Sequence, residues 1–172
     1  MIVDVQKRFV FVHIPRTAGI SVCMSLKPYV SSSVIFDTWI GRHRTAAEIK
    51  RLIGPVWDEC FRFCIWRPVS EITESFHRLV TQAWAMREHI RDPLWLEFVS
   101  RTHELSADEL WASIGWPSDD EPWRLLWLTD NGVDLGVTVY DFCNLRDAWP
   151  DICGHCHVPT NIPLLHLNRT QR

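Results

Sequence analysis

One segment of the chain combines small residues, hydroxyls and a permanent positive charge in an order that could bind an anion. It runs over residues 13–21 and reads His-Ile-Pro-Arg-Thr-Ala-Gly-Ile-Ser. Small residues let an anion approach the backbone, arginine supplies charge, and hydroxyls donate hydrogen bonds. The pattern Gly-x-x-x-x-Gly-Lys-Ser/Thr of common nucleotide loops is absent, so a plain turn is the alternative interpretation. The residues concerned are Arg16, Thr17, Ala18, Gly19 and Ser21.

The flanking residues predict that this segment joins a strand to a helix. Residues 8–13 are a short, continuous run rich in β-branched and aromatic types, typical of a strand buried on both faces. From Ile20 the apolar spacing is helical until Pro28 ends it. The first turn of a helix leaves several N–H groups without helical partners, which makes such a corner suitable for an anion.

Residues 11–22 resemble the 5′-phosphosulfate loop of sulfotransferases that use 3′-phosphoadenosine-5′-phosphosulfate (PAPS). The resemblance is closest to the carbohydrate and heparan 2-O type and its bacterial relatives, whose loop commonly reads His-Ile-Pro-Lys-Thr-Ala/Gly-Gly-Thr-Ser. Arg16 stands in place of the family's lysine, and Ile20 in place of a common threonine. Arginine is a poor proton donor but can stabilise charge that develops on the leaving phosphate. The resemblance implies that the 5′-phosphosulfate is bound by Arg16, Thr17, Ala18, Gly19, Ser21 and Val22.

A second segment resembles the family's contact with the 3′-phosphate. Residues 61–67 read as a strand ending in Arg67, and Ser75 follows eight positions later. In the family such an arginine and serine hold the 3′-phosphate of PAPS. Aligning on Pro68 instead would put Glu74 in the place of the serine. Ser75 lies on the inward stripe of the expected helix with Ile72.

His43 is the candidate catalytic base. It precedes a capping box at residues 45–48, and relatives often carry a histidine in this stretch. Sulfuryl transfer needs the acceptor hydroxyl to lose its proton, and imidazole accepts protons near neutral pH. An exposed surface histidine is the alternative. His13 lies near the loop with an expected structural role, while Asp37 and Glu48 are weaker candidates for the base.

The remaining pattern predicts an α/β fold. Strands are expected at 34–36, 61–66, 125–128 and 137–142, with Asp130-Asn-Gly132 as a turn. Helices are expected at 45–53, after Pro68, and within 88–123, where a second capping box lies at 106–109; the tail from Pro150 reads as a loop. Strands alternating with helices predict one domain over residues 1–172 with a mainly parallel sheet flanked by helices. The resemblance implies that this domain has a P-loop-like sulfotransferase architecture.

Composition excludes several classes of protein. The 172 residues carry 18 basic and 21 acidic side chains, so no general basic field indicates a nucleic-acid or membrane partner. No signal peptide or run of about 20 apolar residues is present, which predicts a cytoplasmic protein. Cys153 and Cys156 form a single Cys-x-x-Cys without a second pair, so no metal site is predicted. The sequence indicates no oligomeric state.

The resemblance, supported by these features, implies a PAPS-dependent sulfotransferase that transfers a sulfuryl group to a hydroxyl of a carbohydrate or small molecule. His43 would be the base, and Arg16 would stabilise charge. The tryptophans within residues 84–127 would either line the acceptor pocket or fill the core. The alternative is a sulfotransferase fold that has lost catalysis and binds a nucleotide or a partner protein. A nucleotide kinase is disfavoured because no Walker lysine is present.

Overall fold

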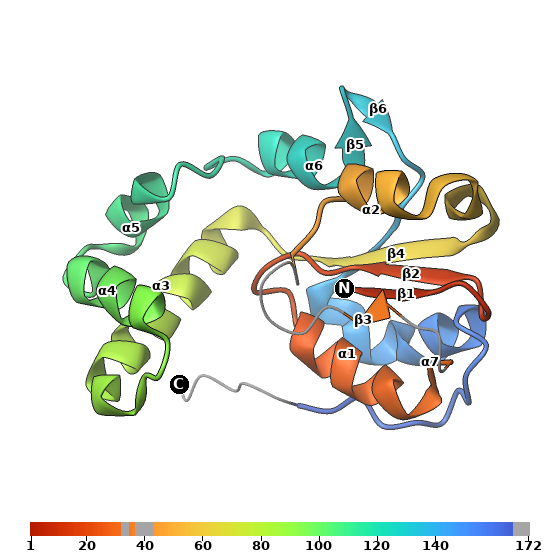
Figure 1. Ribbon diagram of the computed structural model, residues 1–172, viewed down its shortest axis with the longest axis horizontal. Coiled ribbons are helices and arrows are strands. Elements are labelled where there is room, and N and C mark those ends of the chain that lie inside the picture. The colour runs from red at the N-terminus through yellow and green to blue at the C-terminus, as the bar shows by residue number, and fades with distance from the viewer. Residues whose placement is uncertain (32–34, 37–42, 167–172) are drawn as a thin grey trace. The chain divides into compact units, whose positions relative to one another are not determined.

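The computed structural model describes residues 1–31, 35–36 and 43–166. Within them the chain divides into two compact units, one formed by residues 1–67 and 124–166 and the other by residues 68–123. The first unit contains a β-sheet with helices packed against it, and the second unit is helical (Figure 1). The α/β class predicted from the sequence is confirmed, whereas a sulfotransferase-like domain spanning residues 1–172 stays a prediction.

The first unit is built on a mixed sheet with the order β3-β1-β2-β4-β7. Strand β1 runs antiparallel to both of its neighbours, while β2 pairs in parallel with β4 and β4 in parallel with β7. The other strands therefore all point in the same direction, so their carboxyl ends lie at one edge. The strands are β1 (Ile2–Asp4), β2 (Phe9–Val12), β3 (Ile35–Phe36), β4 (Phe61–Trp66) and β7 (Thr138–Asp141).

Helices cover both faces of this sheet (Figure 1). Alternate residues Phe9, Phe11, Phe63 and Ile65 pack in one buried cluster with α1 (Gly19–Leu26) and α7 (Leu145–His155). Helix α2 (Ala46–Ile53) lies on the opposite side. All four residues of β2 are buried, as the continuous apolar run predicts.

The rest of the first unit consists of short elements. Short 3₁₀ helices cover Lys27–Tyr29, Gly54–Glu59 and Phe142–Asn144, here called η1, η2 and η4. Strands β5 (Thr129–Asp130) and β6 (Val133–Asp134) form a separate hairpin around Asn131 and Gly132, both with positive φ. The turn predicted at residues 130–132 is therefore confirmed.

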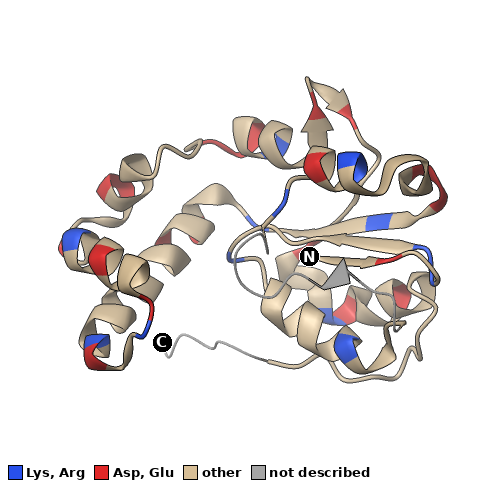
Figure 2. Ribbon diagram, viewed as in Figure 1, with Lys and Arg blue, Asp and Glu red and all other residues tan. Residues whose placement is uncertain are grey.

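The second unit consists of α3 (Val69–Ala85), the 3₁₀ turn η3 (Arg87–His89), α4 (Pro93–Thr102) and α5 (Ala107–Ser113). Buried Val80, Val99 and Leu110 join these helices. Acidic and basic positions are interspersed on their surfaces (Figure 2), including the i,i+4 pairs Arg78–Glu74 and Arg101–Glu97. Of the described residues, no helix has the length and apolar character that crossing a membrane requires.

Two sequence predictions of secondary structure are wrong. Residues 125–128 belong not to a strand but to α6 (Asp120–Leu128), within which the boundary between the two units falls. Trp123 and Trp127 are buried at helical spacing while Leu125 and Leu126 remain 42% exposed, and acidic residues begin the helix. Short apolar runs do not distinguish a strand from a helix.

The second error concerns the tail from Pro150, which is not a loop at its start because Pro150 lies inside α7. Four buried residues, Leu145, Trp149, Ile152 and Cys153, form a stripe at spacings of four, three and one. Burying such a stripe is worth several kcal/mol, of order 1.5–3 for each large side chain, and exceeds the roughly 3 kcal/mol cost of an internal proline.

Candidate functional site

The predicted anion loop connects β2 to α1 with an unusual backbone. Arg16 and Ala18 both have left-handed conformations, with φ of 63° and 64°. Ala18 precedes helical Gly19, and a left-handed residue beside a right-handed one directs successive N–H groups toward one point. This backbone can therefore hold an oxyanion.

The first turn of α1 adds donors to this loop. The first helical hydrogen bond joins Val22 N to Ala18 O at 3.1 Å, and Ala18 contributes no side-chain cap. The N–H groups of Gly19, Ile20 and Ser21 precede that bond and lie at the positive end of the helix dipole. The Val22 N–H is used within the helix, and its side chain is fully buried in the core. Val22 therefore anchors the loop in the hydrophobic core, and its N–H is already used in the helix.

The loop's side chains serve two purposes. The Thr17 hydroxyl is buried and donates to Ile14 O at 2.9 Å, so it closes the loop rather than donating outward as the sequence suggested. Ser21 is 6% exposed, and Arg16 is half-buried. Charge and backbone donors are therefore the loop's principal means of binding an anion.

His43 lies against this loop although thirty residues separate it from His13. Its Nδ1 is 3.0 Å from His13 O, and the two imidazole centroids are 4.5 Å apart. The His43 side chain is exposed, so it is accessible to a second substrate. The structure therefore places the predicted base next to the predicted anion loop. Of the weaker candidates, Glu48 caps its own helix by accepting from Thr45 N at 2.7 Å, and Asp37 lies outside the described residues.

Arg67 follows β4 and lies at the same edge of the sheet as the anion loop. Val12 pairs with Cys64 and Trp66 with Asp141, so the segments after β2, β4 and β7 all leave at this edge. The guanidinium carbon of half-buried Arg67 lies 4.5 Å from the centroid of the Phe142 ring, a cation–π contact. Arginine stacked on a ring can still offer its N–H edge to a phosphate.

Ser75 belongs to the second unit, so its predicted partnership with Arg67 stays a prediction. It is 5% exposed on the buried face of α3 near Ile72. Glu74, the alternative position, is exposed and lies 3.5 Å from the Arg78 guanidinium. Of the two registers, the one that uses Ser75 puts an inward-facing hydroxyl in the family's serine position.

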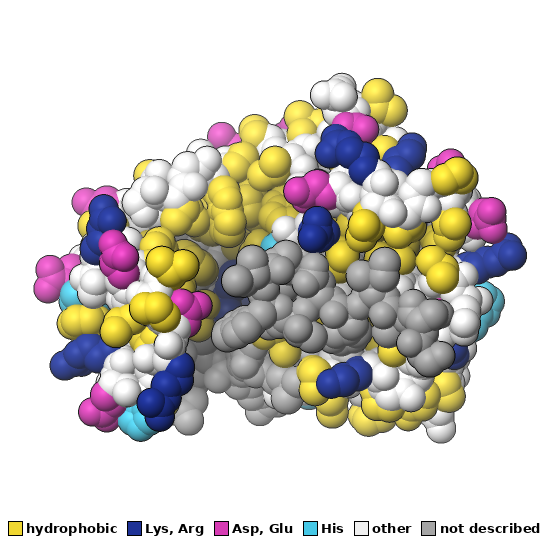
Figure 3. Space-filling model, viewed as in Figure 1, with side chains coloured by type: hydrophobic (Ala, Val, Ile, Leu, Met, Phe, Trp, Pro, Cys, Tyr) yellow, Lys and Arg dark blue, Asp and Glu magenta, His cyan; other side chains and the backbone are white. Residues whose placement is uncertain are grey.

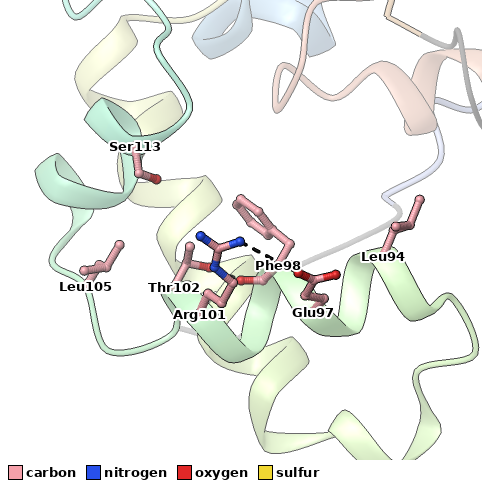
Figure 4. A pocket seen from close by; sticks show the side chains of 7 residues that line it. All are labelled: Leu94, Glu97, Phe98, Arg101, Thr102, Leu105 and Ser113. Carbon is pink, nitrogen blue, oxygen red and sulfur yellow. Dashed lines mark hydrogen bonds and ion pairs between the residues drawn. The ribbon is translucent and has the colours of Figure 1, made fainter.

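The tryptophans of the second unit and α6 mainly fill the core. Trp111, Trp123 and Trp127 are 3%, 0% and 5% exposed, and Trp111 and Trp123 pack with Trp116. A surface groove of about 450 Å³ lies in the second unit (Figure 4). Hydrophobic and charged side chains are mixed on the face of the molecule that Figure 3 shows. The groove is lined by Leu94, Glu97, Phe98, Arg101, Thr102, Leu105 and Ser113. Its aromatic member is Phe98, so the predicted tryptophan-lined acceptor pocket is not found in this groove.

The cysteine pair at the end of α7 is buried. Burial raises the pKa of Cys153 to about 11 and also raises that of Cys156. Buried thiols of this kind stay protonated, whereas zinc binds thiolates. Over residues 1–31, 35–36 and 43–166, no group of three or more His, Cys, Asp or Glu is arranged to hold a metal ion.

Two participants in this site escaped the sequence reasoning. The His13 carbonyl has no signal in a sequence, because every residue has one. Phe142 lies in residues 140–145, which read Tyr-Asp-Phe-Cys-Asn-Leu and resemble the family's Arg-Phe-Glu-Asn-Leu. That similarity could have directed attention to the ring.

The chain matches no protein-family model, no curated protein and no solved structure. The chemistry of the site therefore follows from its geometry alone.

Proposed function

We propose that this protein is a PAPS-dependent sulfotransferase that transfers a sulfuryl group to a hydroxyl of a carbohydrate or small molecule. The observation that carries the proposal is the 3.0 Å contact between His43 Nδ1 and His13 O. It brings a proton acceptor to a loop whose backbone suits an oxyanion. A base beside an anion loop is what transfer from a phosphosulfate to a hydroxyl requires.

The donor fits the residues at this edge. Its 5′-phosphosulfate would lie on the N–H groups of residues 19–21 with Arg16 beside it, and its 3′-phosphate would lie on Arg67. Both contacts are between opposite charges, and arginine suits phosphate because its N–H groups can bind two oxygens at once. PAPS is a co-substrate consumed in each turnover, so no resident cofactor is required.

The reaction then uses two side chains of this chain. His43 takes the proton of the acceptor hydroxyl as its oxygen forms a bond to sulfur. The bond between sulfur and the bridging oxygen of the 5′-phosphate breaks, and its electron pair stays on the departing 3′,5′-bisphosphate. Arg16 and the helix dipole oppose the negative charge that appears there. The products are the sulfated acceptor, the bisphosphate and a proton on His43.

The test separates nucleotide binding from catalysis. Calorimetry should show that 3′-phosphoadenosine-5′-phosphate binds more tightly than AMP, and an acceptor screen with labelled PAPS should reveal transfer. His43→Ala should leave bisphosphate binding unchanged and lower transfer by about 10²–10⁴-fold. His89→Ala is the matched control, because His89 is exposed on the second unit beside Glu88. Equal affinity for the two nucleotides would refute the proposal.

Cys143 offers a further readout of where the nucleotide binds. It is exposed and directly follows Phe142, whereas the other five cysteines are buried. Bisphosphate bound over Arg67 should slow alkylation of Cys143 by iodoacetamide, and AMP should slow it less. Tight, 3′-phosphate-dependent binding with no transfer to any acceptor would favour the catalytically inactive module. The cytoplasmic location and the lack of nucleic-acid or membrane partners stay predictions from the sequence.

A further inference from the structure

His13 occupies the centre of the site. It follows β2 and is only 3% exposed. Its imidazole stacks on Phe11, with centroids 5.7 Å apart and planes at 18°, and contacts His43 at 4.5 Å with planes at 59°. The ring is therefore fixed on one side by the sheet and supports His43 on another.

The His13 ring also lies directly over the start of α1. A Cβ added to Gly19 would lie 1.7 Å from His13 Cδ2 and 1.8 Å from its Nε2. No contact between such atoms is possible at these separations, so glycine is required at position 19 as long as the imidazole keeps its place. The His13 ring therefore fills the space that a side chain at position 19 would need, and it packs directly against the first turn of α1.

The carbonyl of His13 determines which nitrogen of His43 is basic. A carbonyl oxygen can only accept a hydrogen bond, so His43 Nδ1 must donate across the 3.0 Å contact. In the neutral imidazole only one nitrogen carries hydrogen, and Nε2 then holds the lone pair. The base therefore presents Nε2.

We infer that His13 is the positioning residue that couples the anion loop to the catalytic base. Its ring fits over Gly19 and beside His43, and its carbonyl selects the Nδ1–H tautomer of His43. The phosphosulfate and the base are thereby held in register by one residue. The inference rests on the proposed function for its catalytic consequence, but the packing and the tautomer can be measured without it.

A cycle of variants tests the coupling through the shared space. Gly19→Ala should weaken bisphosphate binding and transfer at least tenfold each, because the added methyl collides with the His13 ring and pushes the first turn of α1, with its N–H donors, out of place. His13→Ala should keep bisphosphate binding within about twofold and lower kcat at least tenfold, because misplacement of a catalytic group by about 1 Å can cost up to 10²-fold. Combining the two changes should restore bisphosphate binding relative to Gly19→Ala alone, since the methyl then occupies the vacated space.

Gly154→Ala is the matched control. It also changes a helical glycine, but its added Cβ would meet Thr160 Cγ2 at an ordinary 3.9 Å. This variant should bind bisphosphate and transfer like the unaltered protein. An equal loss in Gly154→Ala and Gly19→Ala would overturn the shared-space argument.

Nitrogen NMR of the His43 ring provides a readout that folding alone would not move. The unaltered protein should show His43 with hydrogen on Nδ1. His13→Ala keeps the backbone carbonyl but removes the ring that holds His43 against it, so this variant should show a mixture with the Nε2–H tautomer. Finding Nε2–H in the unaltered protein would overturn the inference, even if His13→Ala failed to fold. If His13→Ala kept kcat and tautomer, the inference would fail while the proposed function stood. If no bisphosphate bound but His43 carried hydrogen on Nδ1 and the double variant restored the stability lost in Gly19→Ala, the function would fail and the coupling would stand.

Discussion

The stacking of Arg67 on Phe142 leads to a quantitative prediction about the 3′-phosphate. The guanidinium carbon lies 4.5 Å from the ring centroid. The ring restrains the arginine and covers one of its faces, while its N–H edge can still reach a phosphate. Phe142 should therefore affect nucleotide binding only through Arg67.

The expected magnitudes differ for the two side chains. Arg67→Ala removes a charge-assisted hydrogen bond, worth about 1.5–3 kcal/mol, so the bisphosphate should bind roughly 10- to 150-fold more weakly. Phe142→Leu keeps a side chain of similar bulk but removes the aromatic face, worth about 0.5–1 kcal/mol, which is about two- to fivefold in affinity. The double variant should match Arg67→Ala alone, because the ring acts through an arginine that is already gone.

Calorimetry with the 3′,5′-bisphosphate and with AMP provides the assay. AMP lacks the 3′-phosphate, so its affinity should change little in Arg67→Ala. The affinity for the bisphosphate divided by the affinity for AMP should therefore fall toward one in this variant. Arg51→Ala is the control, because it deletes an exposed arginine that pairs with Asp130 at 3.0 Å in the same unit. Equal losses for both nucleotides, or effects of Arg67 and Phe142 that simply add, would refute this reasoning.

Three further predictions concern the loop and its support. Arg16→Ala should lower kcat more than bisphosphate affinity, and Arg16→Lys should restore the rate if a cation beside the bridging oxygen is what matters; steady-state kinetics checks both. Burial acts to raise the pKa of Asp4, but hydrogen bonds from Ser31, Lys7 and Gln6 outweigh it and lower that pKa. The carboxylate therefore stabilises the fold above its unfolded pKa and loses this contribution as pH falls through the folded pKa. Asp4→Asn should remove the part of the stability that is lost as pH falls through the pKa of Asp4. It should also lower the free energy of unfolding in urea by roughly 1–3 kcal/mol at neutral pH, because the amide N–H₂ would face a hydrogen-bond donor. Ala18→Gly should leave bisphosphate affinity within about twofold, since glycine adopts φ of 64° without strain, whereas Ala18→Val should weaken it clearly in the same titration.

Local patterns in the sequence predicted the elements that carry the site. The apolar runs at residues 8–13 and 61–66 correspond to β2 and β4, because strands buried on both faces need continuous apolar side chains. Both capping boxes are present, at Thr45–Glu48 and Ser106–Glu109. Such signals involve residues within a few positions of each other, so a sequence displays them directly.

Longer-range features could not be predicted in the same way. Strand β1 is only three residues long, and its pairing with β2 decides its structure. The contact between His43 and His13 joins residues thirty positions apart, and that between Arg67 and Phe142 depends on the pairing of β4 with β7. The sequence could suggest which side chains have useful chemistry, but only the sheet brings their elements to one edge.

The start of α1 differs from the starts of α2, α3, α4 and α5, and the difference supports the proposed role of the loop. Two non-glycine residues before α1 adopt left-handed conformations, at a cost of roughly 1–2 kcal/mol each, and no side chain caps the helix. Capping boxes begin α2 and α5, Asp92 caps α4, and Asp120 Oδ1 accepts from Val69 N at the start of α3. Helix α7 also begins without a side-chain cap, but no left-handed residue directly precedes it. A serine or aspartate cap before α1 would add about 1 kcal/mol of stability. An aspartate there would also place its own carboxylate on the N–H groups and repel an arriving phosphosulfate. The strained backbone before α1, together with the lack of a side-chain cap, is explained if this turn binds an anion from outside the chain.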